Sequence, residues 1–116
     1  MSTTPRNPPS SFFALELALE TVALARPWVA RVQRHDRELF EQTRRALTRC
    51  VLGLGEGAKR DGGNRQAAFR RARGEANEAL TAIRLAIVWG YLAEDDVAPL
   101  LAKMNHLVAI LVRLTR

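Results

Sequence analysis

Residues 36–59 have the sequence DRELFEQTRRALTRCVLGLGEGAK, in which apolar side chains recur every three or four residues. This spacing is typical of one face of an α-helix. Asp36 stands just before the apolar residues and can accept hydrogen bonds from the first free amides of such a helix. The segment therefore predicts a long helix with a bundle-type seam, formed by Leu39 or Phe40, Thr43, Leu47, Cys50 and Leu54.

The segment before it, Phe12–Ala25, is apolar around most of its circumference. Ser10 or Ser11 can cap its start. Because a single 116-residue bundle has few fully interior helices, such a helix favours self-association. We expect the contact between copies to involve Phe12, Phe13, Leu17 and Leu24.

Pro27 follows this segment, and it lacks the amide that an interior helical position requires. Its ring also disfavours helical geometry at the preceding residue. We expect the first helix to kink or to end near Arg26, with residues 28–33 prolonging it after a bend.

Two further helices are predicted beyond residue 60. The sequence Asp61-Gly-Gly-Asn64 predicts a turn, with Asn64 as the cap of a helix that runs from Arg65 to about Trp89. Gly90 is expected to end that helix in a left-handed conformation. Acidic residues 94–96 suit the positive end of a fourth helix. The predicted buried side chains are Phe69, Ala72, Ala76, Ala79 or Leu80, Ile83 and Ile87, followed by Val97, Leu100, Leu101, Met104, Leu107, Val108, Leu111 and Leu114.

Four helices joined by short turns predict an all-α protein, an antiparallel up-and-down four-helix bundle. Residues 11–116 form a single predicted domain, and the polar, proline-rich residues 1–10 a flexible arm. That arm lacks the apolar stretch of a signal peptide, and residues 12–25 fall short of the about 20 residues that span a bilayer. We expect a cytoplasmic protein without a membrane partner.

Positive charge is concentrated in the middle of the chain. Residues 26–73 carry 13 basic and 5 acidic side chains, a net charge of +8, whereas residues 74–112 carry −3. Arginine outnumbers lysine 16 to 2, which favours forked contacts with phosphate oxygens. A solvated basic face and an acidic protein partner are the alternatives. We predict nucleic-acid binding through Arg44, Arg45, Arg49, Lys59, Arg60, Arg65, Arg70, Arg71 and Arg73.

Catalytic and metal-binding patterns are weak in this chain. His35 and His106 lie in different predicted elements, and neither belongs to a Glu-x-x-His or HExxH motif. Cys50 is the only cysteine and falls on the predicted buried face. The glycines of residues 53–57 lack the spacing of a phosphate-binding loop. We therefore expect no catalytic activity, no metal site and no cofactor.

Short motifs along the chain carry a family resemblance. Arg44, Arg45 and Ala46 correspond to an RRA block, Glu56 and Gly57 to the end of an IPxNIAEG segment, Gly74 and Glu78 to GxxxE, and Gly90-Tyr91-Leu92 to a GYL motif before the last helix. In these motifs the chain resembles the four-helix bundle family of proteins encoded in 23S rRNA intervening sequences. The same family includes the accessory variability determinant of diversity-generating retroelements. The likeness extends over about residues 12–114, with Val51 in place of the family proline and Gly53 in place of the asparagine.

This resemblance implies a homopentameric barrel whose basic surfaces bind nucleic acid and, in the retroelement proteins, a reverse transcriptase. Together with the charge pattern, it leads us to expect a non-catalytic, oligomeric nucleic-acid-binding accessory protein that contacts RNA or DNA phosphates. The rival hypothesis is a self-assembly or protein-adaptor module without nucleic-acid binding, indicated by the apolar first helix.

Overall fold

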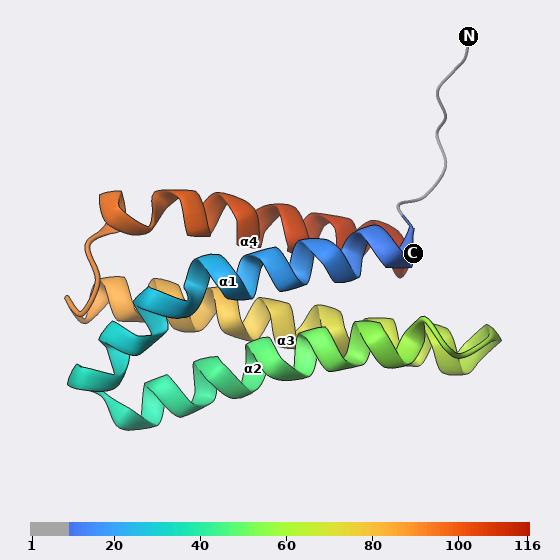
Figure 1. The fold of residues 1–116 in the computed structure, drawn as a ribbon, viewed down its shortest axis with the longest axis horizontal. Helices are drawn as coiled ribbons and strands as arrows, with labels where there is room; N and C mark the ends of the chain where they lie inside the picture. Colours follow the sequence, from blue (N-terminus) through green and yellow to red (C-terminus); the bar gives the residue numbers. More distant parts are fainter. Residues whose placement is uncertain (1–9) are drawn as a thin grey trace, which may run out of the picture.

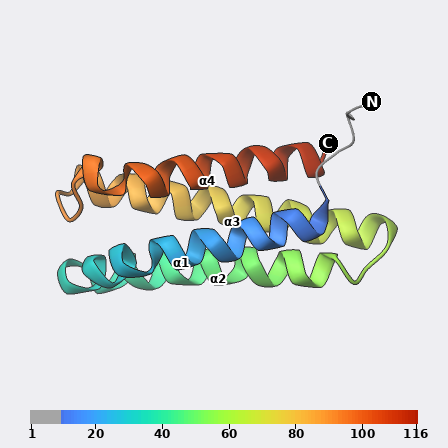
Figure 2. The same cartoon turned by 45° about the horizontal axis from the view of Figure 1, so that its top comes forward.

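A computed structural model describes residues 10–116 as four helices packed side by side (Figure 1): α1 Ser11–His35, α2 Arg37–Gly57, α3 Gly62–Val88 and α4 Glu94–Leu114. Each helix packs against the next, and α4 closes the ring against α1. Consecutive helices run antiparallel in both views (Figures 1 and 2). The predicted all-α, four-helix bundle is confirmed. Residues 1–9 of the predicted arm lie outside the described residues.

Two of the predicted helix caps are confirmed. The Ser10 side chain accepts a hydrogen bond from the Phe13 amide at 3.0 Å, at the start of α1. Asp36 accepts one from the Leu39 amide at 3.0 Å, while its own amide donates to the Val32 carbonyl at 2.8 Å. This single residue therefore ends α1 and begins α2.

The structure decides between the alternatives at Pro27 and corrects the predicted start of the third helix. Of the two alternatives for Pro27, an end near Arg26 is excluded, since α1 is continuous to His35 with Pro27 inside it. Prolongation beyond Pro27 is what the structure has, and the ribbon of α1 turns toward α2 over its last turns (Figure 1). Pro27 is exposed, so the Ala23 carbonyl that loses its helical partner can bond to water. The third helix starts at Gly62, whose φ of +59° suits glycine, so Asn64 lies within the first turn and is not the cap.

Alanines on α3 bring it close to α2, the partner against which it packs most extensively. Gly53 of α2 lies beside Ala72, and Gly57 lies directly against the ring of Phe69. All five predicted core positions of α2 are confirmed once Leu39 is chosen over Phe40, because Leu39 is buried and Phe40 half-buried. On α3 and α4 the predicted stripes are broadly right, although Ile87, Leu101, Val108 and Leu114 are only half-buried.

The turn between α3 and α4 is also as expected. Gly90 has a φ of +84°, and the Tyr91 amide donates to the Ala86 carbonyl at 2.9 Å. The Tyr91 hydroxyl donates to Asp36 Oδ2 at 3.2 Å, and its ring stacks on His35 with centroids 5.1 Å apart. These contacts tie the α3–α4 turn to the junction of α1 and α2.

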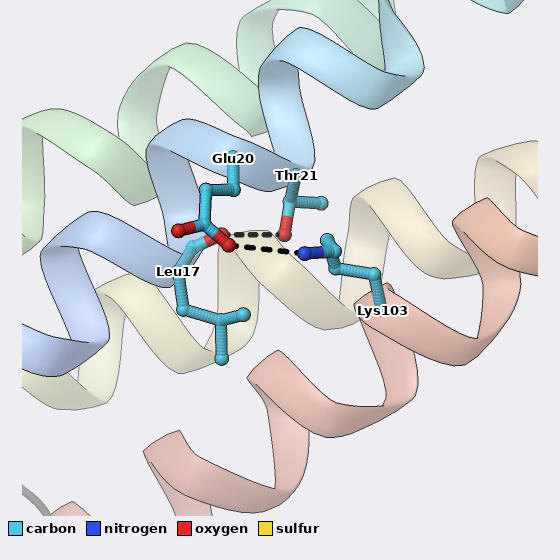
Figure 3. Close-up of polar contacts among 4 residues, drawn as sticks. All are labelled: Leu17, Glu20, Thr21 and Lys103. Atoms are coloured by element: carbon cyan, nitrogen blue, oxygen red, sulfur yellow. Dashed lines mark hydrogen bonds and ion pairs between the residues drawn. The ribbon is translucent and has the colours of Figure 1, made fainter.

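Threonine hydroxyls inside the bundle are satisfied locally. Thr21 donates to the Leu17 carbonyl at 2.7 Å, and Thr43 makes the equivalent bond to Leu39. Next to Thr21, Lys103 of α4 pairs with Glu20 of α1 at 3.0 Å (Figure 3). This ion pair links α1 to α4 on the side of the bundle away from α2.

Within the described residues, α4 is long and apolar enough to cross a membrane by length and composition. A third of its most apolar 18-residue window is buried in the bundle. Core helices of soluble proteins meet the same criterion, so this property is weak evidence for a membrane span.

Candidate nucleic-acid interface

Three arginines on the outer side of α2 are exposed and available. Arg44, Arg45 and Arg49, termed here the arginine row, form no ion pair with any carboxylate of residues 10–116. They line a shallow hollow together with Glu41, which instead pairs with Arg37 at 3.5 Å. The row therefore presents three forked donors to solvent, none of them engaged in an ion pair within residues 10–116.

Two other predicted arginines share one carboxylate. Arg60 Nε lies 3.4 Å from Glu56 Oε1, and Arg71 Nη2 of α3 lies 3.7 Å from the same oxygen. All three side chains are about half exposed or more, so the pairs are weakened by solvent. Glu56 nevertheless lowers the positive potential of the surface between α2 and α3.

Arg65 and Arg73 connect α3 to the start of α1 and to the end of α4, at one end of the bundle. Arg65 Nη2 donates to Ser11 Oγ at 3.2 Å, and its guanidinium lies 5.3 Å from the centre of the Phe69 ring. Arg73 Nη1 donates to Thr115 Oγ1 at 2.9 Å. Both side chains are half-buried, so their donors are partly used within the fold.

Lys59 and Arg70 complete the predicted set. Both are exposed, and neither forms an ion pair within residues 10–116. Lys59 lies in the turn after α2, whereas Arg70 lies on α3. The nine predicted residues thus divide into a row on α2, two single exposed cations, two arginines paired with Glu56 and two that brace the fold.

Sequence reasoning left Arg26 out of the site. This exposed residue of α1 lines a groove between α1 and α2 together with Arg44, so two helices contribute cations to the same region. Val22 and Val29 lie four residues before and three residues after Arg26, so helical spacing places all three on the same side of α1. The pairing of α1 with α2 was needed to bring Arg26 and Arg44 to one groove.

The four residues expected to form the contact between copies differ in their exposure. Phe12 is 70% and Phe13 45% exposed, whereas Leu24 is half-buried. Leu17 is only 5% exposed and packs in the core of its own bundle, so it is not part of an outer surface. Exposed apolar side chains outside the expected set are Leu19, Leu52, Leu85, Val88, Trp89 and Val112.

The side chains that could act as nucleophiles or metal ligands lie outside the arginine row. Cys50 is buried, and burial, with a smaller contribution from the charge of Glu75, raises the pKa of its thiol to about 12. Partial burial and the hydrogen bond to Asp36 raise the pKa of Tyr91 above its usual value. Within residues 10–116, no three His, Cys, Asp or Glu side chains are grouped closely enough to hold a metal ion.

Comparison with protein-family models, curated proteins and solved structures gives no match to this chain. The four-helix, all-α domain is what the chain itself displays. The function proposed below therefore rests on the residues and surfaces of this chain.

Proposed function

We propose that this protein is a non-catalytic, cytoplasmic accessory protein that binds RNA or DNA through the phosphate backbone. The observation that carries the proposal is the arginine row on α2, whose three guanidinium groups are exposed and have no partner carboxylate within residues 10–116. A guanidinium donates two parallel hydrogen bonds to phosphate oxygens, and each contact releases condensed counterions from the nucleic acid.

The position of the arginine row on the bundle supports recognition of the phosphate backbone of a nucleic acid. Its helix packs on one side against α1 and on the other against α3, and the row occupies the remaining outer side. Phosphate contacts position a protein on nucleic acid but carry no sequence information, so we expect structure-dependent, sequence-tolerant binding.

We also propose that the protein acts as a homo-oligomer related to the 23S rRNA intervening-sequence and retroelement accessory proteins, with a pentamer and a reverse-transcriptase partner as specific forms of that proposal. Support for association comes from Phe12 and Phe13, large apolar side chains left exposed at the start of α1. Repetition of the row in each copy would strengthen individually weak phosphate contacts.

The salt dependence of binding tests the proposed function. Fluorescence anisotropy with a structured RNA and a duplex DNA should show binding at low salt, with the logarithm of the association constant falling linearly with the logarithm of salt concentration. An absence of binding at low salt, or a flat salt dependence, would overturn the proposal.

A second function is favoured by the exposed apolar side chains at both ends of the bundle. Phe12 is 70% exposed at one end, and Val88 and Trp89 are 82% and 63% exposed at the other. Large apolar side chains exposed in this way are candidate contacts for protein association. This alternative is an assembly or adaptor module without nucleic-acid binding. It predicts an oligomer by native mass spectrometry and a loss of assembly in Phe12→Ser, without any salt-dependent nucleic-acid binding.

A further inference from the structure

The groove between α1 and α2 has an apolar lining. Its volume is about 300 Å³, at the lower end of the range of about 300–1,000 Å³ that small-molecule sites occupy. Aliphatic side chains from both helices and one aromatic ring surround it. These side chains belong to Val22, Ala25, Val29, Ala30, Phe40 and Leu47. A hydrocarbon group placed against these side chains is removed from water.

Two cations stand at this apolar groove, one on each helix. Arg26 of α1 and Arg44 of α2 both line it, both are exposed, and neither pairs with a carboxylate within residues 10–116. Gln33 and Thr48 supply the remaining polar lining, and both are uncharged. No acidic residue among residues 10–116 lines the groove, so an anion bound there can accept charge-assisted hydrogen bonds from these guanidinium groups.

Other hollows on the molecule differ in charge. The groove between α2 and α3 contains Arg49 and Arg71 but also Glu56 and Glu75. The hollow near the start of α4 contains Arg84 together with Glu94. Among these three, only the α1–α2 groove joins an apolar lining to cations without an acidic residue.

We propose that the α1–α2 groove binds an aliphatic carboxylate, a hydrocarbon chain that ends in one carboxylate group. The chain lies along Val22, Val29 and Leu47, and Arg26 and Arg44 hold the carboxylate. Arg44 also belongs to the arginine row, but binding of the carboxylate is measured without nucleic acid, so failure of either proposal leaves the other standing.

Decanoate, used below the concentration at which it forms micelles, is the probe. Isothermal titration calorimetry should give one site per chain, and methyl NMR shifts should be concentrated at Val22, Val29 and Leu47. Decyltrimethylammonium has the same hydrocarbon chain with a cationic head, and it should not saturate the groove. Equal binding of the two probes, or shifts centred on Phe12 or Trp89, would overturn the proposal.

Two variants test the cations and the cavity separately. R26Q/R44Q should weaken decanoate binding by at least about tenfold, the change expected when charge-assisted hydrogen bonds are lost. Ala30→Trp adds a large side chain at an exposed lining position and should abolish binding. The matched controls are R34Q/R113Q, which also removes two positive charges, and Ala23→Trp. Both alter exposed positions outside the groove and should leave the affinity unchanged.

Because Ala30→Trp can disturb the fold, circular dichroism must show native helix content before its result is used. R26Q/R44Q replaces exposed side chains and provides the independent test. An unchanged decanoate affinity in folded R26Q/R44Q would overturn the proposal, whatever the result for Ala30→Trp.

Discussion

The arginine row on α2 and the arginines nearer the α2–α3 turn are close in sequence but differ in their surroundings. Arg44, Arg45 and Arg49 are exposed and form no ion pair within residues 10–116. Arg60 and Arg71, in contrast, share Glu56. An arginine that already has a carboxylate partner must give up that partner, or share its donors, to bind phosphate. Partner geometry, and not residue type, therefore distinguishes the two regions.

Removing the row should have the largest effect on binding. R44Q/R45Q/R49Q eliminates three proposed phosphate contacts, so we expect at least about a hundredfold lower affinity for structured RNA at low salt. The slope of the logarithm of affinity against the logarithm of salt concentration should decrease in magnitude by about 3, one for each contact. Fluorescence anisotropy over a salt series measures both quantities.

The matched control makes the same charge change among engaged arginines. R60Q/R65Q/R71Q also removes three positive charges, but these side chains contact Glu56, Ser11 and Phe69. Its loss of affinity should be at least several-fold smaller than that of the row variant. Equal losses would show that total charge, and not the row, controls binding.

A glycine on α2 maintains the close approach that brings Glu56 to Arg71. A Cβ at Gly57 would lie 2.7 Å from Cδ1 of the buried Phe69 ring, so Gly57→Ala should destabilise the fold by about 1–3 kcal/mol. A Cβ at Gly55 meets nothing within 4 Å, so Gly55→Ala should stabilise the helix by about 0.5–1 kcal/mol. Urea unfolding curves give both values. Equal effects of the two substitutions would rule out the close contact as the cause.

The inner side of α2 offers a third test, since Cys50 lies in the core while the row faces solvent. Burial raises the pKa of its thiol to about 12, so at pH 8 the thiol is protonated and should react with Ellman's reagent only after unfolding. The unfolded thiol ionises near its ordinary value of 9.0, before the folded one. Ionisation of the thiol in the unfolded chain alone lowers the free energy of unfolding. The full free energy of unfolding is therefore present below pH 9, and the part that depends on Cys50 is lost as the pH rises toward 12.

Urea unfolding at a series of pH values measures this loss, with Cys50→Ala as the reference. The variant should lack the cysteine contribution to the pH dependence, although its lower overall stability reflects the missing sulfur. Rapid labelling of the native protein at pH 8 would contradict the buried position of Cys50.

The smallest effect is expected from releasing the engaged arginines. Glu56→Gln frees Arg60 and Arg71 from their shared carboxylate and should raise nucleic-acid affinity by roughly twofold to fivefold at low salt. The side chains are about half exposed or more, so the stability change should stay below about 1 kcal/mol. Glu16→Gln, an exposed position on α1, is the control for the change in net charge. Equal gains in nucleic-acid affinity in Glu56→Gln and Glu16→Gln would show that the ion pairs of Glu56 do not limit binding.

Helical spacing predicted most of the fold. The core face of α2 follows from Thr43, Leu47, Cys50 and Leu54, because residues three and four apart share one side of a helix. At Pro27 the sequence left two alternatives open, and the helix continues because a proline on the solvent side leaves a carbonyl that water can satisfy. Asn64 is a favourable cap by residue type, but the third helix already begins at Gly62.

The candidate site could be predicted only in outline. Charge counting placed the basic region on the second and third helices, which is where the row and its neighbours lie. Partnerships such as Arg65 with Ser11, 54 residues apart, and Arg73 with Thr115, 42 residues apart, depend on how the helices pack together. The sequence does not show which distant residues the folded helices bring into contact, so it could not distinguish arginines with a partner from arginines without one.

Arginine footprinting tests the distinction between the two regions most directly. The protein is treated with phenylglyoxal in the presence and absence of a structured RNA, and mass spectrometry measures modification at each arginine. Binding through the row predicts strong protection of Arg44, Arg45 and Arg49, with little change at Arg60 and Arg71. Protection confined to Arg60 and Arg71, or equal protection of all five, would contradict it.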